Sequence, residues 1–275
     1  MRISGRTKIT GIFGYPVEHT LSPGMHNAAF EKIGLDYCYL PFLVRPDYLE
    51  DAVKSIRALN FSGVNITIPH KEKVMVFLDE VDEEAAFIGA VNTVVNSGGI
   101  LKGYNTDGRG FMRSLSENGV DVKNKDVAII GAGGAARAIG YYLSRDAGTL
   151  SVYGRTKERA ETLVRDLDKV KGNVALMRDI LEVQKFHIIV NATPLGLKEN
   201  DPLPFDPEVL KPGQIVCDII YKKTGLLHEA SKKGCVAIDG LGMLLWQGVL
   251  SFELWTREKP PVEVMRNALK AAIKE

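Results

Sequence analysis

Short apolar runs alternate with longer segments of helical periodicity along this chain, and the alternation predicts an α/β protein built from two blocks. In the first block we expect strands at 8–13, 36–43 and 63–68. Ser22 followed by Pro23 predicts the start of a helix, with the serine as N-cap and the proline at the first helical position.

A helix and a hairpin extend this block. Pro46 is expected to open a helix that ends near Leu59. Apolar runs at 90–95 and 100–104 are joined through Ser97-Gly98-Gly99, a spacing typical of antiparallel strands with a tight turn. The sheet of this block is therefore predicted to be mixed.

A different pattern begins with a helix predicted from Asp107 to about Asn118. Strands are then expected to alternate with helices, as in a doubly wound parallel sheet. The final stretch, 240–275, has apolar residues near helical period and is expected to fold back over the first block. The predicted domains are 1–106 plus 240–275, and 107–239. The strands expected in the second domain are 126–130, 149–153, 186–191, 214–220 and 236–239.

The most informative motif lies where the strand at 126–130 breaks at Gly131 and continues through Gly133 and Gly134 into a helix. Gly131 permits a tight turn, Gly133 lets a phosphate approach the backbone, and Ala136 keeps the helix close to the strand. The helix N-terminus offers N–H groups to an anion. A tight strand–helix turn without a ligand is the alternative. The flanking strand and helix favour a dinucleotide, so this domain is predicted to have the Rossmann fold.

The tip of the next strand indicates which dinucleotide binds. An NAD site has an acid there for the ribose hydroxyls, but positions 152 to 157 contain none. Arg155, together with Thr156, Lys157 and Arg159, suits a 2′-phosphate instead. A solvated basic helix start is the alternative, above all for Lys157 and Arg159. We therefore predict NADP. Thr193 follows another strand at the same edge, where it either contacts the cofactor or forms a structural turn.

Composition excludes several classes of protein. The 275 residues carry a formal net charge of +1, which gives no general electrostatic basis for binding nucleic acid or membranes. Three separated cysteines argue against a disulfide framework and against a zinc site with paired thiolates. The N-terminus lacks an apolar signal core, so a cytoplasmic protein is expected. His19, His26 and His70 are predicted to act in turns or hydrogen bonds, and no metal is expected.

Several separated motifs resemble the shikimate dehydrogenase family over essentially the full chain. The similarity includes the stretches around the glycine turn and Arg155 and six further segments. These are Gly14-Tyr-Pro-Val-Glu-His-Thr-Leu-Ser-Pro-Gly-Met-His-Asn27, Asn65-Ile-Thr-Ile-Pro-His-Lys71, Gly89-Ala-Val-Asn-Thr93, Gly103-Tyr-Asn-Thr-Asp-Gly108 and Asn191-Ala-Thr-Pro-Leu-Gly196, followed by Gly240-Leu-Gly-Met243 with Gln247.

The resemblance implies reduction of 3-dehydroshikimate to shikimate with NADPH, without metal, in the biosynthesis of chorismate and aromatic amino acids. It implies Lys71 and Asp107 as the catalytic pair. For substrate binding it implies Thr20, Ser22, Asn65, Thr67, Asn92, Tyr221 and Gln247. For the cofactor it implies Gly131, Ala132, Gly133, Gly134, Ala135, Gly154, Arg155, Thr156, Lys157, Arg159, Thr193, Ile219, Gly240 and Met243.

Three positions depart from the family pattern. Thr20 replaces the usual serine but keeps a hydroxyl. Gly154 stands where asparagine is common, so one hydrogen bond to the adenosine phosphate is lost. After Tyr221 the link through Lys222-Lys223-Thr224 is shorter than usual.

Each catalytic assignment has a structural alternative. Reduction of a ketone creates an alkoxide that must receive a proton, and Lys71 with a neighbouring Asp107 could supply it. Taken alone, the lysine reads as a surface residue and the aspartate as a helix cap. Which of the two delivers the proton stays open.

The binding assignments also have alternatives. Asn65 and Thr67 alternate along a strand, so they share one polar face, which is unexpected for a buried strand. Ser22 could serve as a helix cap and Asn92 as a strand-end amide. Tyr221 and Met243 are equally compatible with core packing.

Two rival functions share this scaffold. A paralogue could act on quinate or on an aminated analogue, and a non-catalytic metabolite sensor could keep the fold without turnover. The sequence does not distinguish a monomer from a homodimer.

Overall fold

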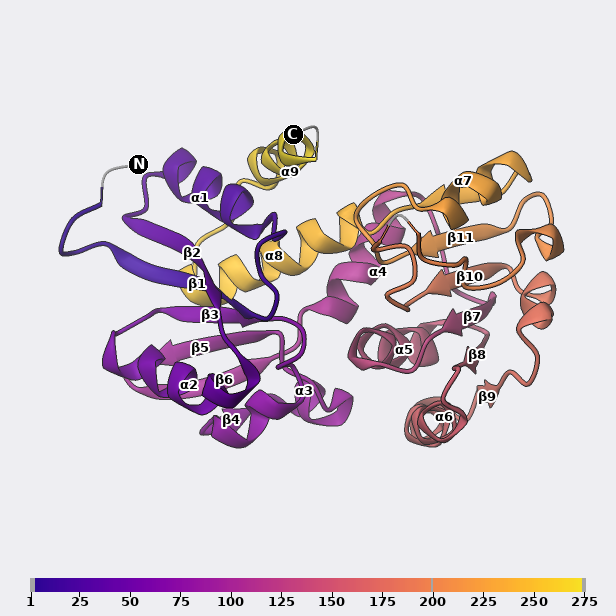
Figure 1. Cartoon of the computed structure of the whole chain (residues 1–275), viewed down its shortest axis with the longest axis horizontal. Coiled ribbons are helices and arrows are strands. Elements are labelled where there is room, and N and C mark those ends of the chain that lie inside the picture. Colours follow the sequence, from indigo (N-terminus) through magenta and orange to yellow (C-terminus); the bar gives the residue numbers. More distant parts are fainter. Residues whose placement is uncertain (1–2, 199, 274–275) are drawn as a thin grey trace. The chain divides into compact units, whose positions relative to one another are not determined.

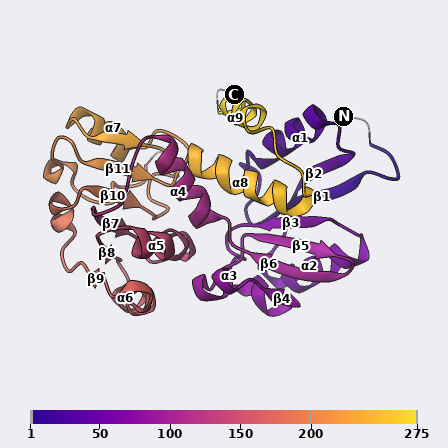
Figure 2. The same ribbon diagram turned by 180° about the vertical axis from the view of Figure 1, so that it is seen from behind.

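The computed structural model describes residues 3–198 and 200–273. The described chain divides into two compact units, which are treated separately. Unit 1 comprises 1–106 and 247–275, and unit 2 comprises 107–246. The second boundary differs from the predicted one at 239/240 because it falls inside a continuous helix, α8 (Leu241–Thr256), visible in Figure 2. No helix in the described ranges is long and apolar enough to cross a membrane.

Within the described residues, unit 1 is built on a six-stranded mixed sheet with the order β2-β1-β3-β5-β6-β4. Its strands are β1 (Lys8–Gly14), β2 (Tyr37–Leu43), β3 (Gly63–Ile66), β4 (Glu80–Val81), β5 (Thr93–Ser97) and β6 (Ile100–Tyr104). β1 pairs in parallel with β2 and β3, whereas β5 is antiparallel to β3 and β6. The β5–β6 turn has Gly98 and Gly99 at positive φ, so the predicted hairpin and mixed sheet are confirmed.

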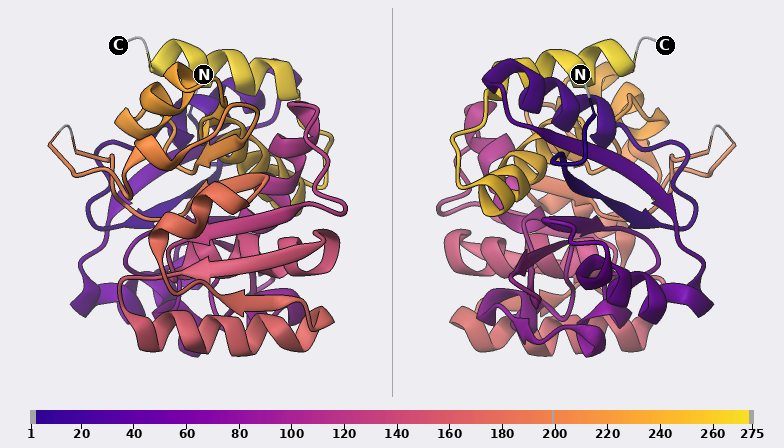
Figure 3. Two further views of the ribbon diagram at one scale, coloured as in Figure 1. Left: turned by 90° about the vertical axis from the view of Figure 1, so that its right-hand side faces the viewer. Right: turned by 90° about the vertical axis from the view of Figure 1, so that its left-hand side faces the viewer.

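The two faces of this sheet carry different layers. Phe13, Val64 and Ile66 pack with apolar residues of α2 in one buried cluster. On the other face, Trp255 of α8 donates to the Val94 carbonyl at 3.0 Å, and α9 packs against α1. Figure 3, right, shows α1 and the neighbouring strands β1 and β2 in indigo. The helical segments of unit 1 are α1 (Ser22–Ile33), α2 (Leu49–Ala58), α3 (Glu83–Ile88), α9 (Val262–Ala272) and the 3₁₀ turns η1 (Pro46–Tyr48) and η2 (Lys73–Phe77).

Two local predictions in unit 1 were wrong. The N-cap of α1 is Leu21, without a side-chain cap bond, and Ser22 is already helical. The serine side chain is buried and turns toward Tyr39 rather than toward the helix N–H groups. The helix predicted from Pro46 begins as a separate 3₁₀ turn, and α2 starts only at Leu49.

Unit 2, as far as it is described, contains a six-stranded parallel sheet with the order β12-β11-β10-β7-β8-β9. Its strands are β7 (Asp126–Ile130), β8 (Thr149–Tyr153), β9 (Val174–Leu176), β10 (Ile188–Asn191), β11 (Ile215–Asp218) and β12 (Val236–Ile238). They lie side by side in Figure 3, left. The order reverses beside β7, which is the doubly wound arrangement that the sequence predicts.

Helices cover this sheet. α4, α5 and α6 follow one another in contact, and α5 and α6 lie next to each other in Figure 1, while α7 packs on β11 and β12. These helices are α4 (Asp107–Glu117), α5 (Gly134–Asp146), α6 (Lys157–Lys171) and α7 (Gly225–Lys232), with 3₁₀ turns η3 (Ile180–Lys185) and η4 (Pro207–Val209). Val127, Ile129 and Ile189 are fully buried in the central strands, so β7 and β10 form the rigid base of the glycine turn.

Candidate functional site

Two loops of unit 1, after β1 and after β3, are hydrogen-bonded to each other. Tyr15 N donates to the Ile68 carbonyl, and Thr67 N donates to the Phe13 carbonyl, both at 3.0 Å. A Cβ on Gly14 would overlap the Thr67 methyl group, so any larger residue would require the Thr67 side chain to move. The half-buried Thr67 thus lies just beyond the end of β3, in a loop that is held in place by the loop after β1.

The backbone around Lys71 is held on both sides. His70 is fully buried, and its Nε2 lies 2.7 Å from the Val44 carbonyl oxygen. The Lys71 carbonyl accepts a hydrogen bond from Val91 N at 2.8 Å. The predicted hydrogen-bonding role of His70 is confirmed. The backbone that carries the half-buried Lys71 side chain is therefore held in place by hydrogen bonds at both residues.

Thr20 and Ser22 lie next to each other at the start of α1. The Thr20 hydroxyl accepts a long hydrogen bond from Ser22 N at 3.4 Å. Ser22 is buried, while Thr20 is half-buried. Both residues lie at the N-terminus of a twelve-residue helix, an end that favours an anionic group.

Asn65 lies at the centre of a buried hydrogen-bond network. Its Oδ1 accepts from the Tyr39 hydroxyl at 2.8 Å, while its Nδ2 donates to Thr93 Oγ1 at 3.1 Å, to Ser251 Oγ at 3.0 Å and to the Asn92 carbonyl at 3.1 Å. The side chain therefore has protein partners for its donors and its acceptor. This arrangement explains why a polar residue is tolerated inside a buried strand.

Asn92 continues the network toward Thr106. Its Nδ2 donates to Thr106 Oγ1 at 2.9 Å, and its Oδ1 accepts from Thr106 N at 2.8 Å. Asn92 precedes β5, although the predicted strand included it. The Thr106 hydroxyl also donates to the carbonyl of Gln247, in the part of α8 that belongs to unit 1.

His26 differs from its predicted role in a turn or hydrogen bond. It lies within α1 with no exposed surface, and neither ring nitrogen has a partner among the described residues. The imidazole stacks on Tyr39, with ring centroids 4.4 Å apart, and approaches Phe252 and Trp255. Burial lowers the pKa of His26 to about 3, so the ring is neutral at ordinary pH.

The glycine turn of unit 2 links β7 to α5 through a residue at positive φ. Gly131 has φ +123°, and a Cβ there would press against the Ala192 carbonyl at 2.8 Å. Gly133 is exposed and is the N-cap residue of α5. A Cβ there would meet no neighbouring atom within 4 Å. Ala132, Gly134 and Ala135 are half-buried beside it. The space beside Gly133 and the helix start that follows it are features that a dinucleotide phosphate site uses.

The basic residues predicted for the adenosine phosphate are all exposed. Arg155 and Thr156 follow β8, and Lys157 and Arg159 lie in the first turn of α6. Lys157 is 3.7 Å from Glu161, a neighbour along the same helix. Thr156 caps α6 without a side-chain hydrogen bond, so its hydroxyl does not occupy the helix N–H groups.

Gly154 lies in a tight place between α5 and α6. A Cβ there would be 3.1 Å from the Ala160 Cβ and 3.3 Å from the Ala132 Cβ. The residue that replaces the common asparagine of the family pattern therefore permits close approach of these two helix starts.

The ends of β10 and β11 are joined by a buried carboxylate that the sequence analysis did not single out. Asp218 is 2% exposed and accepts from Asn191 Nδ2 at 3.1 Å and from the Thr224 hydroxyl at 2.8 Å. Asn191 Oδ1 in turn accepts from the Thr193 hydroxyl at 2.7 Å. Burial raises the pKa of Asp218 above its ordinary value, partly offset by these donors. An acid at the end of the apolar run 214–220 was the available signal.

The remaining predicted residues lie in unit 2 as follows. Ile219 N donates to the Asn191 carbonyl at 3.1 Å, and a Cβ on Gly240 would overlap the Ile219 carbonyl. Met243 is buried, Tyr221 is half-buried, and Asp107 is buried at the start of α4. Gly240 and Met243 thus belong to the same unit as the glycine turn, rather than to the other domain as predicted.

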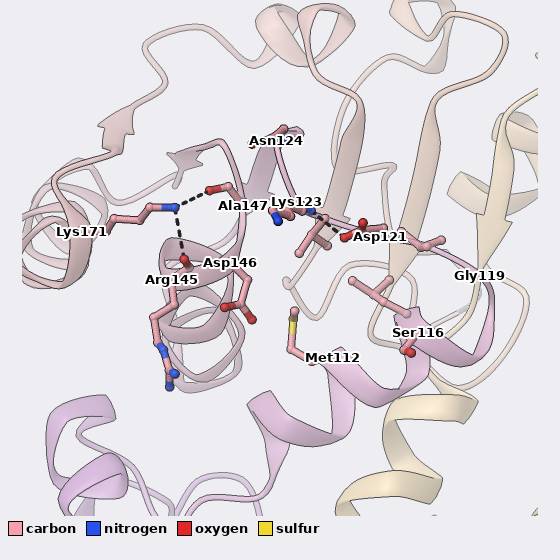
Figure 4. Close-up of a pocket in the computed structure, with 13 residues that line it drawn as sticks. Met112, Ser116, Gly119, Asp121, Lys123, Asn124, Arg145, Asp146, Ala147 and Lys171 are labelled. Carbon is pink, nitrogen blue, oxygen red and sulfur yellow. Dashed lines mark hydrogen bonds between the residues drawn. The ribbon is translucent and has the colours of Figure 1, made fainter.

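A surface pocket of about 730 Å³ in unit 2 lies away from these residues (Figure 4). It is lined by the loop before β7 and the segment before β8, which places it at the amino ends of the strands. Lys171 donates there to the carbonyls of Arg145 and Ala147 at 3.3 and 3.2 Å and so satisfies the end of α5. Ligands of doubly wound sheets bind at the carboxyl ends, so this pocket is separate from the candidate nucleotide site.

Comparisons with known proteins decide the family. Residues 12–94 match the family model described as shikimate dehydrogenase substrate binding domain. Residues 114–196 match the shikimate/quinate 5-dehydrogenase model, and residues 240–270 match the shikimate 5'-dehydrogenase C-terminal domain. A shikimate dehydrogenase (NADP(+)) of Desulforamulus reducens is 47% identical, with 98% of this chain and 96% of the relative covered.

The chain belongs to the shikimate dehydrogenase family.

Crystal structures of the family agree with this assignment. A shikimate dehydrogenase in complex with NADP+ has a TM-score of 0.94 at 40% identity, with 100% of this chain and 98% of that chain covered. The Thermus thermophilus shikimate 5-dehydrogenase, in complex with NADP(H) and shikimate, has a TM-score of 0.90 at 36% identity over 96% and 99% of the two chains. Within the described residues, no group of three or more His, Cys, Asp or Glu side chains could hold a metal ion.

Proposed function

We propose that this shikimate dehydrogenase family member reversibly reduces 3-dehydroshikimate to shikimate with NADPH. The observation that carries the proposal is the retention, in one chain that covers 96% of its relative, of a lysine-bearing substrate unit and a glycine-turn unit with Arg155. When bound, NADPH supplies the hydride for the ketone carbon. The residues of this chain then have three tasks, namely holding the cofactor, holding the ring and moving a proton.

Unit 2 holds the cofactor in this proposal. The N–H groups at the start of α5 receive the pyrophosphate, where Gly133 leaves open space. Arg155, supported by Thr156, binds the 2′-phosphate through charge-assisted hydrogen bonds. Thr193, Ile219, Gly240 and Met243 contribute to the nicotinamide end. This division gives the cofactor one phosphate site at the glycine turn and a second at the tip of β8.

A second set of residues, most of them in unit 1, holds the ring and delivers the proton. The hydroxyls of Thr20 and Ser22 bind the substrate carboxylate, and Tyr221 adds a further hydroxyl from unit 2. Thr67, Asn92 and Gln247 bind the ring hydroxyls. Lys71 of unit 1 and Asp107 of unit 2 are the proposed acid–base residues for the proton transfer. Asn65, whose polar atoms already have protein partners, supports this set rather than reaching the ring itself.

The substrate and cofactor preference of the purified protein tests the proposal. Formation of reduced cofactor, followed by absorbance, is measured with shikimate or quinate as substrate and with NADP+ or NAD+ as cofactor. We expect the highest kcat/KM with shikimate and NADP+. A preference for quinate with NAD+ would assign the protein to the paralogue. Binding of NADP+ and shikimate in calorimetry without turnover would instead support a metabolite sensor.

A further inference from the structure

Tyr39 is a fully buried residue of β2 whose hydroxyl touches two of the residues that carry the substrate motifs. The hydroxyl donates to Asn65 Oδ1 at 2.8 Å, and the Ser22 side chain hydrogen-bonds to the same phenol. Burial raises the pKa of this phenol above its usual value, so it stays a hydrogen-bond donor over the working pH range. The phenol therefore joins α1 to β3 by a chain of neutral groups.

The position of the phenol is fixed by contacts on both ends of the residue. Tyr39 N donates to Asn27 Oδ1 at 2.8 Å, and Asn27 Nδ2 donates back to the Tyr39 carbonyl at 3.0 Å. The ring lies against the His26 imidazole, with an interplanar angle of 13°. A ring held in this way places its hydroxyl without a further loss of rotamer freedom.

The same hydroxyl determines which way the Asn65 amide points. Because it donates to Oδ1, the Nδ2 group faces the Asn92 carbonyl at 3.1 Å and the Ser251 hydroxyl at 3.0 Å. The reversed amide would bring its oxygen against the Asn92 carbonyl, which places two acceptors together. The orientation of Asn65 in turn fixes the main chain at Asn92, whose side chain is a proposed ligand of the ring.

We propose that Tyr39 is a positioning residue of the substrate site, which fixes the Ser22 side chain by accepting a hydrogen bond from it and which orients the Asn92 segment through Asn65. This inference rests on the proposed function, since it assigns Tyr39 to the binding of the same substrate. It predicts an effect on shikimate binding that does not extend to the cofactor.

The test compares Tyr39→Phe with Tyr37→Phe, which removes a hydroxyl two positions earlier on the same face of β2. We expect Tyr39→Phe to raise KM for shikimate by about three- to tenfold, the effect of one lost hydrogen bond. Its kcat and its KM for NADP+ should stay within about twofold of wild type, and Tyr37→Phe should change neither KM.

Three outcomes would overturn the inference. They are an unchanged KM for shikimate in Tyr39→Phe, an equal rise in both KM values, and a KM rise in Tyr37→Phe as large as that in Tyr39→Phe. If wild type does not turn over shikimate, the proposed function fails instead, and the two failures are thus distinguishable.

A double-mutant cycle with Ser22→Ala supplies an independent measurement. If Tyr39 acts in part by fixing Ser22, then Tyr39→Phe should raise the KM of the Ser22→Ala protein by a smaller factor than it raises the KM of wild type. Full multiplication of the two single effects would contradict the Ser22 part of the proposal.

Discussion

The substrate residues proposed in unit 1 and the phosphate-binding residues proposed in unit 2 differ most in burial. Ser22 and Asn92 are buried, and Asn92 already exchanges hydrogen bonds with Thr106. Arg155 and Arg159 are exposed. The substrate side is thus organised by the fold before a ligand arrives, whereas the basic cluster consists of long side chains on the surface.

Because of this difference in burial, substitutions in the two regions should affect different properties of the protein. A buried network loses little entropy on binding because its side chains are already ordered, but removing one member also weakens the fold. An exposed arginine contributes little to stability, and its attraction for phosphate falls with salt. Changes in unit 1 should therefore alter both stability and substrate binding, and changes at the basic cluster should alter cofactor binding alone.

Removal of the proposed acid should have the largest effect. Lys71→Ala is expected to lower kcat by about 10²- to 10⁴-fold, the usual contribution of a positioned proton donor. Binding of NADP+, measured by calorimetry, should be unchanged because the cofactor groups lie in unit 2. The matched control is Lys73→Ala, an exposed lysine two positions later. A kcat for Lys71→Ala within tenfold of wild type would remove the lysine from the chemistry.

Arg155 tests the opposite side of the comparison. Arg155→Ala is expected to raise KM for NADP+ by about ten- to a hundredfold, since a hydrogen bond between charged groups is lost. KM for NAD+, which has no 2′-phosphate, should hardly change, and added salt should narrow the difference between wild type and variant. The thermal midpoint should stay the same because the side chain is exposed.

Arg165→Ala is the control for this variant, because Arg165 is exposed on α6, the helix that follows Arg155, and carries no proposed role. An equal rise in KM for NADP+ in the two variants would mean that NADP+ binding depends only on the total positive charge of the protein. The assignment of Arg155 to the 2′-phosphate would then be wrong.

His26 makes unit 1 sensitive to acid. Its pKa is lowered to about 3 in the fold, while an unfolded histidine titrates near 6.5, so the unfolded chain gains the proton first as pH falls. The contribution of His26 to the free energy of unfolding is fully present above pH 6.5. It decreases below that pH, by about 2 kcal/mol at pH 5. The groups stacked around it are Tyr39, Phe252 and Trp255, which supply no compensating charge.

Urea unfolding at pH 7 and pH 5 measures this effect. His26→Phe should keep the aromatic stacking and lose about 2 kcal/mol less stability between the two pH values than wild type does. The exposed His228→Gln should behave like wild type. If His26→Phe and wild type lose equal stability on acidification, the imidazole is not the acid-sensitive group.

Local patterns were sufficient to predict most of the fold. The strand at 126–130 and the glycine turn depend on neighbours in sequence, and the confirmed hairpin depends on Gly98 and Gly99 alone. β4 and β9 were missed because two and three residues are too few to show a period of two. The predicted domain boundary at 239/240 differs from the observed one at 246/247, because the chain changes units within the continuous helix α8.

The partners of the site residues could not be predicted in the same way. Asn65 meets Ser251 across 186 positions, and no local spacing indicates such a contact. Ser22 has the ideal sequence of a helix cap, yet its side chain turns to Tyr39 from another segment. His26 shows the same limit, because its burial depends on Phe252 and Trp255 near the other end of the chain.

Gly154 should give the smallest effect, and it tests whether tight packing can be exchanged for phosphate binding within unit 2. Gly154→Asn introduces the amide common in the family, and its Cβ must displace Ala160 and Ala132, which would lie at 3.1 and 3.3 Å, by a few tenths of an ångström. We expect about a threefold lower KM for NADP+, from one added hydrogen bond, together with a loss of about 1 kcal/mol in unfolding free energy. Gly154→Ala should show the same loss of stability without the gain in KM, because it adds the Cβ but not the amide. If both variants bind NADP+ like wild type, the amide does not reach the phosphate. Gly154 would then serve only to permit the close approach of Ala132 and Ala160.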